Sequence, residues 1–64
     1  MGLNERQILT VMYVMEKGST NLSSLKTVVP GVSEKTLYRD LQNLVKKGVF
    51  TEIGEKKGRK YELK

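Results

Sequence analysis

The residues with the clearest chemical potential lie in the stretch 32–50, VSEKTLYRDLQNLVKKGVF. Leu37, Leu41 and Leu44 recur there at helical spacing, which predicts one buried helix face. The opposite face carries side chains that can donate hydrogen bonds or stack: Lys35, Tyr38, Arg39, Gln42, Asn43 and Lys46. None of them is an acid, and these residue types suit contacts with phosphates and base edges.

Arg39 is the strongest candidate for contact with a base, because its guanidinium can donate two parallel hydrogen bonds to guanine O6 and N7. The alternative is a surface arginine that pairs with Asp40 or Glu34. Asp40 is an acid beside the leucine stripe. We interpret it as structural, bound by backbone donors or by Arg6 from another helix.

The remaining polar groups of this helix have two open interpretations each. Gln42 and Asn43 can bind adenine edges or phosphates, or they are simply solvated. Tyr38 can contact the DNA backbone or cover the edge of the core. The N-terminal end of the helix suits phosphate oxygens, and the residues expected to contact DNA there are Ser33, Lys35 and Thr36. For Ser33 the alternative is an ordinary N-cap.

A second basic group lies in the segment GEKKGRKYEL near the C-terminus. The tip of this segment, residues 55–60, holds four cations and Glu55, a net charge of +3, and long cations on a hairpin can follow phosphates or enter a narrow minor groove. The alternative is that lysines here discourage edge-to-edge pairing of strands. The candidate phosphate contacts are Lys56, Lys57, Arg59 and Lys60.

The charge of the whole chain also favours a polyanionic partner. The 64 residues hold 12 Lys and Arg against 7 Asp and Glu, a net charge of +5. Residues 33–64 hold nine of the cations and five of the acids, so the basic excess lies in the half with the polar face. Asymmetric basic charge of this kind is typical of nucleic-acid binding.

The composition argues against several other classes of protein. The chain has no Cys and no His, which removes disulfides, the common zinc sites and most nucleophile–base pairs. We therefore expect no enzyme activity and no cofactor. No apolar run approaches the ~18 residues of a membrane span, and no signal peptide precedes the fold. The expected location is cytoplasmic, in association with the nucleoid.

A first helix of about residues 4–17 is predicted from its end signals. Asn4 and Gln7 form a capping-box pattern, and Gly18 suits the left-handed residue that ends a helix. An apolar stripe predicts the buried face of this helix: Ile8, Val11, Met12 and Met15, with Leu9 at its edge.

Tyr13 and Val14 fall off this stripe and are expected at the surface. Exposed apolar residues are ordinary, but two adjacent ones can also mark contact with a twin subunit or with the remainder of a longer protein. Two side chains cover far less than the ~1,000 Å² of a stable interface, so we expect a monomer.

The other elements are predicted from helix caps, helix-breaking residues and strand patterns. Ser23 is predicted to cap a short helix of about residues 24–29, which ends before Pro30 because the residue before a proline disfavours helix. The connector before it leaves room for a third short strand at 20–22. Ser33 caps the long helix, and the remaining predicted elements are the helix 34–47 and the strands 49–53 and 60–63.

These elements predict one domain, residues 1–64, of the α+β class and mostly α. Three helices are followed by a two-stranded β-hairpin. A short helix, a tight turn and a longer helix are the parts of a helix-turn-helix, whose second helix enters the major groove. The hairpin directly after it has the position of a wing. The fold expected is a winged helix-turn-helix.

The sequence resembles winged helix-turn-helix domains of small bacterial and archaeal transcription regulators over residues 3–63. GVSEKTLYRDLQNLVKKGVF resembles the recognition-helix pattern of DeoR-type regulators, and LNERQILTVM resembles the start of the winged helix appended to Fic-type proteins. The tip GEKKGRKYEL departs from the Fic-appended pattern, which is richer in Gly, Ser and Thr there.

The resemblance implies the DNA-binding domain of a prokaryotic transcription regulator, with double-stranded DNA as partner. The alternative is a winged-helix protein-interaction or regulatory module appended to a larger protein, such as a Fic-type adenylyl transferase. RNA fits less well, because the aromatic platforms that stack splayed bases are absent.

Overall fold

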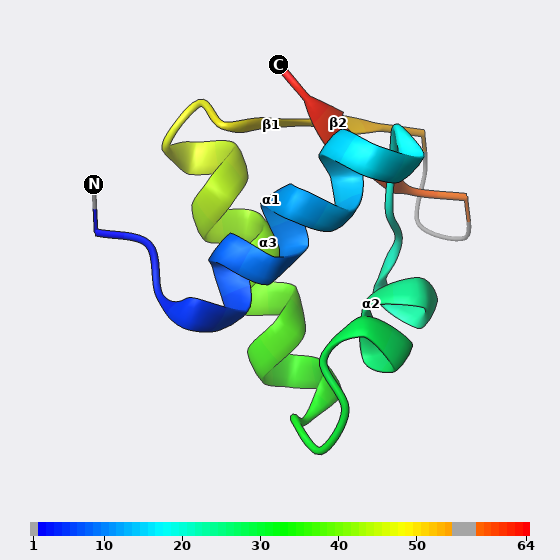
Figure 1. Ribbon diagram of the computed structural model, residues 1–64. Helices are drawn as coiled ribbons and strands as arrows, with labels where there is room; N and C mark the ends of the chain where they lie inside the picture. Colours follow the sequence, from blue (N-terminus) through cyan, green and yellow to red (C-terminus); the bar gives the residue numbers. More distant parts are fainter. Residues whose placement is uncertain (1, 55–57) are drawn as a thin grey trace.

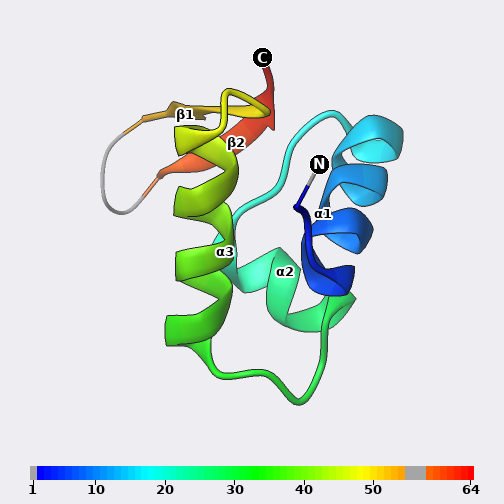
Figure 2. The ribbon, with the colours of Figure 1, turned by 90° about the vertical axis from the view of Figure 1, so that its left-hand side faces the viewer.

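The computed structural model describes residues 2–54 and 58–64, and Figure 1 shows three helices followed by an antiparallel hairpin. The elements are α1 (Glu5–Lys17), α2 (Leu22–Val28), α3 (Glu34–Lys46), β1 (Phe50–Ile53) and β2 (Lys60–Leu63). The three helices pack against one another, and the hairpin lies at the C-terminal end of α3 (Figure 2). The predicted winged helix-turn-helix fold, α+β and mostly helical, is confirmed.

The core forms where α3 meets the other elements. Leu37, Leu41 and Leu44 are completely buried, as their helical spacing predicts. Phe50 from β1 and Tyr61 from β2 close the core on the hairpin side. Because all three leucines point inward, the opposite face of α3 is necessarily turned outward.

The predicted buried face of α1 is wrong. The buried residues of this helix are Gln7, Thr10 and Val14, and Val14 is only 1% exposed. Four members of the predicted apolar stripe and its edge lie at the surface instead: Ile8 (47% exposed), Leu9 (44%), Met12 (58%) and Met15 (68%). The interpretation of Val14 as a partner contact is therefore overturned, and Tyr13 is half-buried against the core.

Hydrogen bonding explains why two polar side chains replace apolar ones on the inner face of α1. The Gln7 amide donates to the Asp40 carbonyl oxygen at 3.2 Å and to Asn43 Oδ1 at 3.1 Å. Thr10 Oγ1 donates to the Arg6 carbonyl oxygen at 2.8 Å. A buried polar group with a partner costs little, so these residues can occupy the interior.

The start of α2 also differs from the prediction. Asn21, not Ser23, is the N-cap, and its side-chain oxygen accepts from the Ser24 N–H at 2.8 Å. The helix therefore begins at Leu22, two residues earlier than predicted. The short strand predicted at 20–22 is reduced to a single bridge, in which Thr20 and Tyr61 exchange backbone hydrogen bonds of 2.9 and 2.8 Å.

The ends of α1 and α3 follow their local signals. Asn4 and Gln7 form the predicted capping box, and Gly18 ends α1 with a positive φ of 93°. Ser33 caps α3, accepting from the Thr36 N–H at 3.3 Å. Within residues 2–54 and 58–64, no helix is long and apolar enough to cross a membrane.

Candidate nucleic-acid interface

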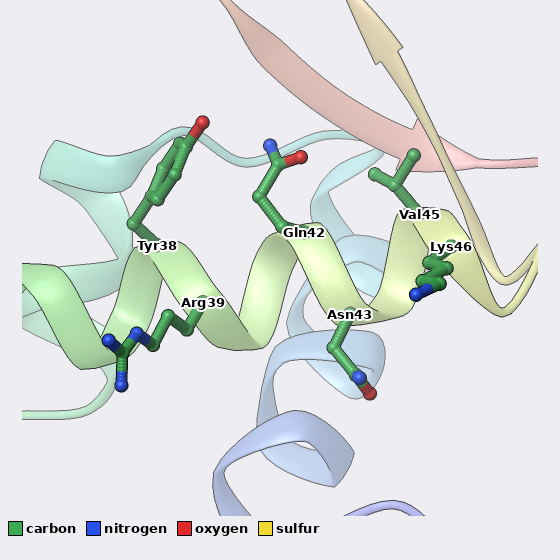
Figure 3. A pocket seen from close by; sticks show the side chains of 6 residues that line it. All are labelled: Tyr38, Arg39, Gln42, Asn43, Val45 and Lys46. Atoms are coloured by element: carbon green, nitrogen blue, oxygen red, sulfur yellow. The ribbon is translucent and has the colours of Figure 1, made fainter.

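The outward face of α3 forms an open hollow of about 370 Å³. Figure 3 shows the side chains that line it, all from α3: Tyr38, Arg39, Gln42, Asn43, Val45 and Lys46. Five of these six were predicted as the polar face, and Val45 is the addition. Lys35 is exposed on the same helix, one turn before Arg39. The structure thus brings the predicted α3 residues together on one surface.

Arg39 is available for an external ligand because both predicted acidic partners are engaged elsewhere. Asp40 pairs with Arg6 at 2.7 Å, and Glu34 pairs with Lys26 at 3.2 Å. Among the residues that the structure describes, Arg39 forms no ion pair and no hydrogen bond through its side chain. In Figure 3 its side chain runs along α3 toward the N-terminal end of the helix. This geometry favours the DNA-contact hypothesis over the surface ion pair.

Asp40 holds the N-terminal end of α1 against α3, as its structural interpretation predicts. Asp40 is 6% exposed, and its carboxylate accepts from Arg6 Nε at 2.7 Å and from Asn4 Nδ2 at 3.1 Å. The hydrogen bond from Arg6, followed by the charge of Asp40, raises the pKa of the Arg6 guanidinium. The acid is neutralised on the side of α3 that faces away from the hollow, so it does not repel an anion there.

A polar cluster that was not predicted from the sequence joins α3 to the hairpin. Gln42 Nε2 donates to Glu52 Oε2 at 2.6 Å and to the Tyr61 hydroxyl at 3.2 Å. Arg59 Nη1 lies 3.4 Å from Glu52 Oε2. Glu52 and Tyr61 face each other across the two strands, which places both beside Gln42. Alternation along the strands was the only signal that could have paired them.

The ionisation of this cluster follows from its contacts. The charge of Glu52, followed by a hydrogen bond with Tyr61, raises the pKa of Arg59. Burial is the main cause that raises the pKa of Tyr61 above its usual value. At neutral pH the cluster therefore holds a cationic Arg59 and a neutral Tyr61 hydroxyl. Arg59 Nε is buried without a hydrogen-bond partner among the described residues.

Asn43 lies on the other side of the hollow and is bonded toward α1. Its Oδ1 accepts from Gln7 Nε2, and the orientation of Gln7 is itself fixed because its Oε1 accepts from the Asn4 N–H at 3.0 Å. The Nδ2 group of Asn43 is therefore the part left for an external ligand. Neither Gln42 nor Asn43 is simply solvated.

The other predicted contacts among the described residues lie outside the hollow on α3. Ser33 is an N-cap, and its hydroxyl also donates to Thr36 Oγ1 at 2.9 Å, so both hydroxyls are engaged locally. Lys60 lies 3.7 Å from Glu62 in an exposed pair. Lys56 and Lys57 lie outside the described residues. The structure therefore gathers the α3 residues and Arg59, whereas the wing-tip contacts stay predictions.

A family model described as HxlR-like helix-turn-helix matches residues 3–63. The match covers nearly the whole chain and supports the DNA-binding helix-turn-helix domain of a transcription regulator. It does not extend to the finer resemblances to DeoR-type regulators or to Fic-appended domains. The comparison with curated proteins found no match.

Proposed function

We propose that this chain, which belongs to the HxlR-like helix-turn-helix family, binds duplex DNA with α3 in the major groove and the hairpin on phosphates. Arg39 contacts a base edge, and Lys35 and Lys46 lie on either side of it along the exposed face of α3. The N-terminal end of α3 and the wing cations Lys56, Lys57, Arg59 and Lys60 hold the backbone. The domain carries out no catalysis, needs no cofactor and acts in the cytoplasm on the nucleoid.

The observation that carries this proposal is the outward face of α3, which keeps cations and excludes acids. Arg39 is exposed, and the two acids nearest to it in the sequence are held by Arg6 and Lys26. Exposed cations facing outward attract phosphates, and release of the counterions of DNA supplies most of the non-specific binding energy.

Binding to a random-sequence duplex at several salt concentrations tests the proposal. If α3 and the wing neutralise about five phosphates, the slope of log K against log salt is about −4 to −5. NMR titration with the same duplex should shift the amide signals of α3 first. A slope near zero, or no binding at low salt, would contradict the proposal.

A matched pair of variants distinguishes a DNA contact on α3 from a general effect of net charge on duplex binding. Lys46 lines the hollow, whereas Lys17 is an exposed cation in the last turn of α1. We expect Lys46→Ala to reduce the size of the salt slope by about one, because one phosphate contact is lost. Lys17→Ala removes the same charge and should leave the slope nearly unchanged.

The exposed apolar side of α1 favours a second candidate function, contact with another protein or with the remainder of a longer chain. Ile8, Leu9, Met12 and Met15 are all more than two-fifths exposed, and clustered apolar surface of this kind often marks an interface. A regulatory module appended to an enzyme, such as a Fic-type adenylyl transferase, would use this side. Salt-dependent duplex binding by the isolated chain distinguishes the two candidates, because only the first requires it.

A further inference from the structure

We propose that Glu52 orients the side-chain amide of Gln42 so that Gln42 offers DNA a hydrogen-bond acceptor and no donor. Glu52 is then a positioning residue that sets base preference without touching DNA. This inference rests on the proposed function, because it specifies what the hollow on α3 can recognise.

The orientation of the Gln42 amide follows from the chemistry of its partner. A carboxylate only accepts hydrogen bonds, so the atom 2.6 Å from Glu52 Oε2 must be the NH₂ nitrogen of Gln42. The same nitrogen lies 3.2 Å from the Tyr61 hydroxyl. Both donor hydrogens of the amide therefore have partners on the hairpin.

The oxygen of the same amide is left for an external ligand. Within the part of the chain that the structure describes, Gln42 Oε1 receives no hydrogen bond. Gln42 also lines the same hollow as Arg39, on the side of α3 that carries Tyr38 (Figure 3). The polar atom of Gln42 that is left for an external ligand is thus its carbonyl oxygen.

Two further contacts position Glu52 beside Gln42. Glu52 is itself fixed by Arg59, whose Nη1 is 3.4 Å from the same carboxylate oxygen, and both side chains are about 70% buried. Glu52 faces Tyr61 in the register of the hairpin, so the backbone of the wing places the carboxylate. Rotating the Gln42 amide would bring its oxygen against the Glu52 carboxylate, which repels it.

This orientation changes which bases Gln42 can favour. A free glutamine binds adenine in a bidentate manner, donating to N7 while accepting from N6. With its NH₂ group held by Glu52, Gln42 can accept from the exocyclic amino group of cytosine or adenine only. Guanine O6 and thymine O4 are acceptors that face its oxygen unfavourably. We expect a preference of about five- to tenfold for an amino base at this position, the lower end of the range for a bidentate pair.

The test selects binding sequences from a library of duplexes randomised over the binding site. Gln42→Leu identifies the contacted position, because the base preference there is lost. Wild type should prefer cytosine or adenine at that position over guanine and thymine. Glu52→Ala frees the NH₂ group, so the preference should narrow to adenine or fall below twofold.

Two further variants separate orientation from charge. Glu52→Gln supplies an amide oxygen that can still accept from Gln42, and it should restore the wild-type preference. Glu62→Ala removes the same charge from the same hairpin, where Glu62 pairs with Lys60, and it should leave the preference unchanged. Wild-type preference in Glu52→Ala that still binds duplex would overturn the inference and leave the proposed function standing.

The side-chain amide signals of Gln42 give a readout without DNA. They should shift in Glu52→Ala and stay in place in Glu62→Ala, because only the first variant removes their acceptor. Unchanged Gln42 signals in Glu52→Ala would overturn the inference. Absence of duplex binding at low salt would overturn the proposed function and this inference with it, even where the amide signals shift.

Discussion

The buried face of α1 predicts that two neighbouring substitutions differ in their effect on stability. Val14 is 1% exposed and Met15 is 68% exposed, although both are apolar and adjacent in one helix. Val14→Ala removes two buried methyl groups. We therefore expect it to lower the free energy of unfolding, whereas Met15→Ala should change it little.

The magnitude follows from burial. Each buried methyl or methylene group contributes about 0.8 kcal/mol, and the cavity left by Val14→Ala adds to that loss, so the cost is about 2 kcal/mol. Met15→Ala is a surface change and should stay within about 0.5 kcal/mol. A chain of this length has a total stability of roughly 3–10 kcal/mol, so the first loss is a large share.

Thermal and urea unfolding followed by circular dichroism measure both effects. A loss of about 2 kcal/mol lowers the Tm of a domain this small by about 10 °C. Met15→Ala is the matched control for helix propensity, because both variants introduce alanine. An equal or larger loss in Met15→Ala would show that the apolar stripe faces inward after all, and the description of α1 would be refuted.

Three further outcomes are expected. Arg39→Ala should reduce the preference among duplex sequences, whereas Lys57→Ala should weaken binding to all duplexes equally and reduce the size of the salt slope by about one. Equal, sequence-independent losses of affinity in quantitative binding assays would make Arg39 a phosphate contact only. Because burial raises the pKa of Tyr61, the contribution of its neutral hydroxyl to stability should be complete below pH about 10 and be lost as the pH rises through the folded-state pKa, and alkaline unfolding of Tyr61→Phe should lack this loss. Sedimentation should show a monomer at micromolar concentration that the double variant Met12→Ser, Met15→Ser does not change; a tight wild-type dimer lost in that variant would contradict this.

The monomer prediction rests on the charges that interrupt the apolar side of α1. Glu5 and Glu16 are exposed on the same side of the helix as Met12. Pairing this side with a second copy would bring two carboxylates from each chain into the contact, where like charges repel. The apolar area of four side chains on one helix is also small against the roughly 800 Å² per partner of a standard interface.

Elements whose signals are local could be predicted from the sequence. The Ser33 cap, the leucine period and Gly48 define α3 within one residue at its end, because each signal acts inside one or two helical turns. The outward polar face of α3 follows directly from the inward leucines. The candidate site could therefore be predicted as a set of residues.

The parts that failed depend on partners far away in the sequence. Gln7 is buried because it bonds to Asp40 and Asn43, more than thirty residues further along the chain. No periodicity within α1 can indicate that these partners exist, so the apolar stripe gave the wrong face. The Gln42–Glu52 contact likewise depends on the register of the hairpin, which sets Glu52 opposite Tyr61.

The arrangement of acids explains why net charge understates the field over α3. Asp40, Glu34, Glu52 and Glu62 each lie within 4 Å of a cation, and those cations are Arg6, Lys26, Arg59 and Lys60. Two of these cations, Arg6 and Lys26, come from α1 and α2, so acids of the C-terminal half are neutralised partly by the N-terminal half. Among the described residues, the cations along the outward face of α3 form no ion pair with an acid. Three cations outside these ion pairs, Lys35, Arg39 and Lys46, therefore lie together on one helix face, where an approaching duplex meets them.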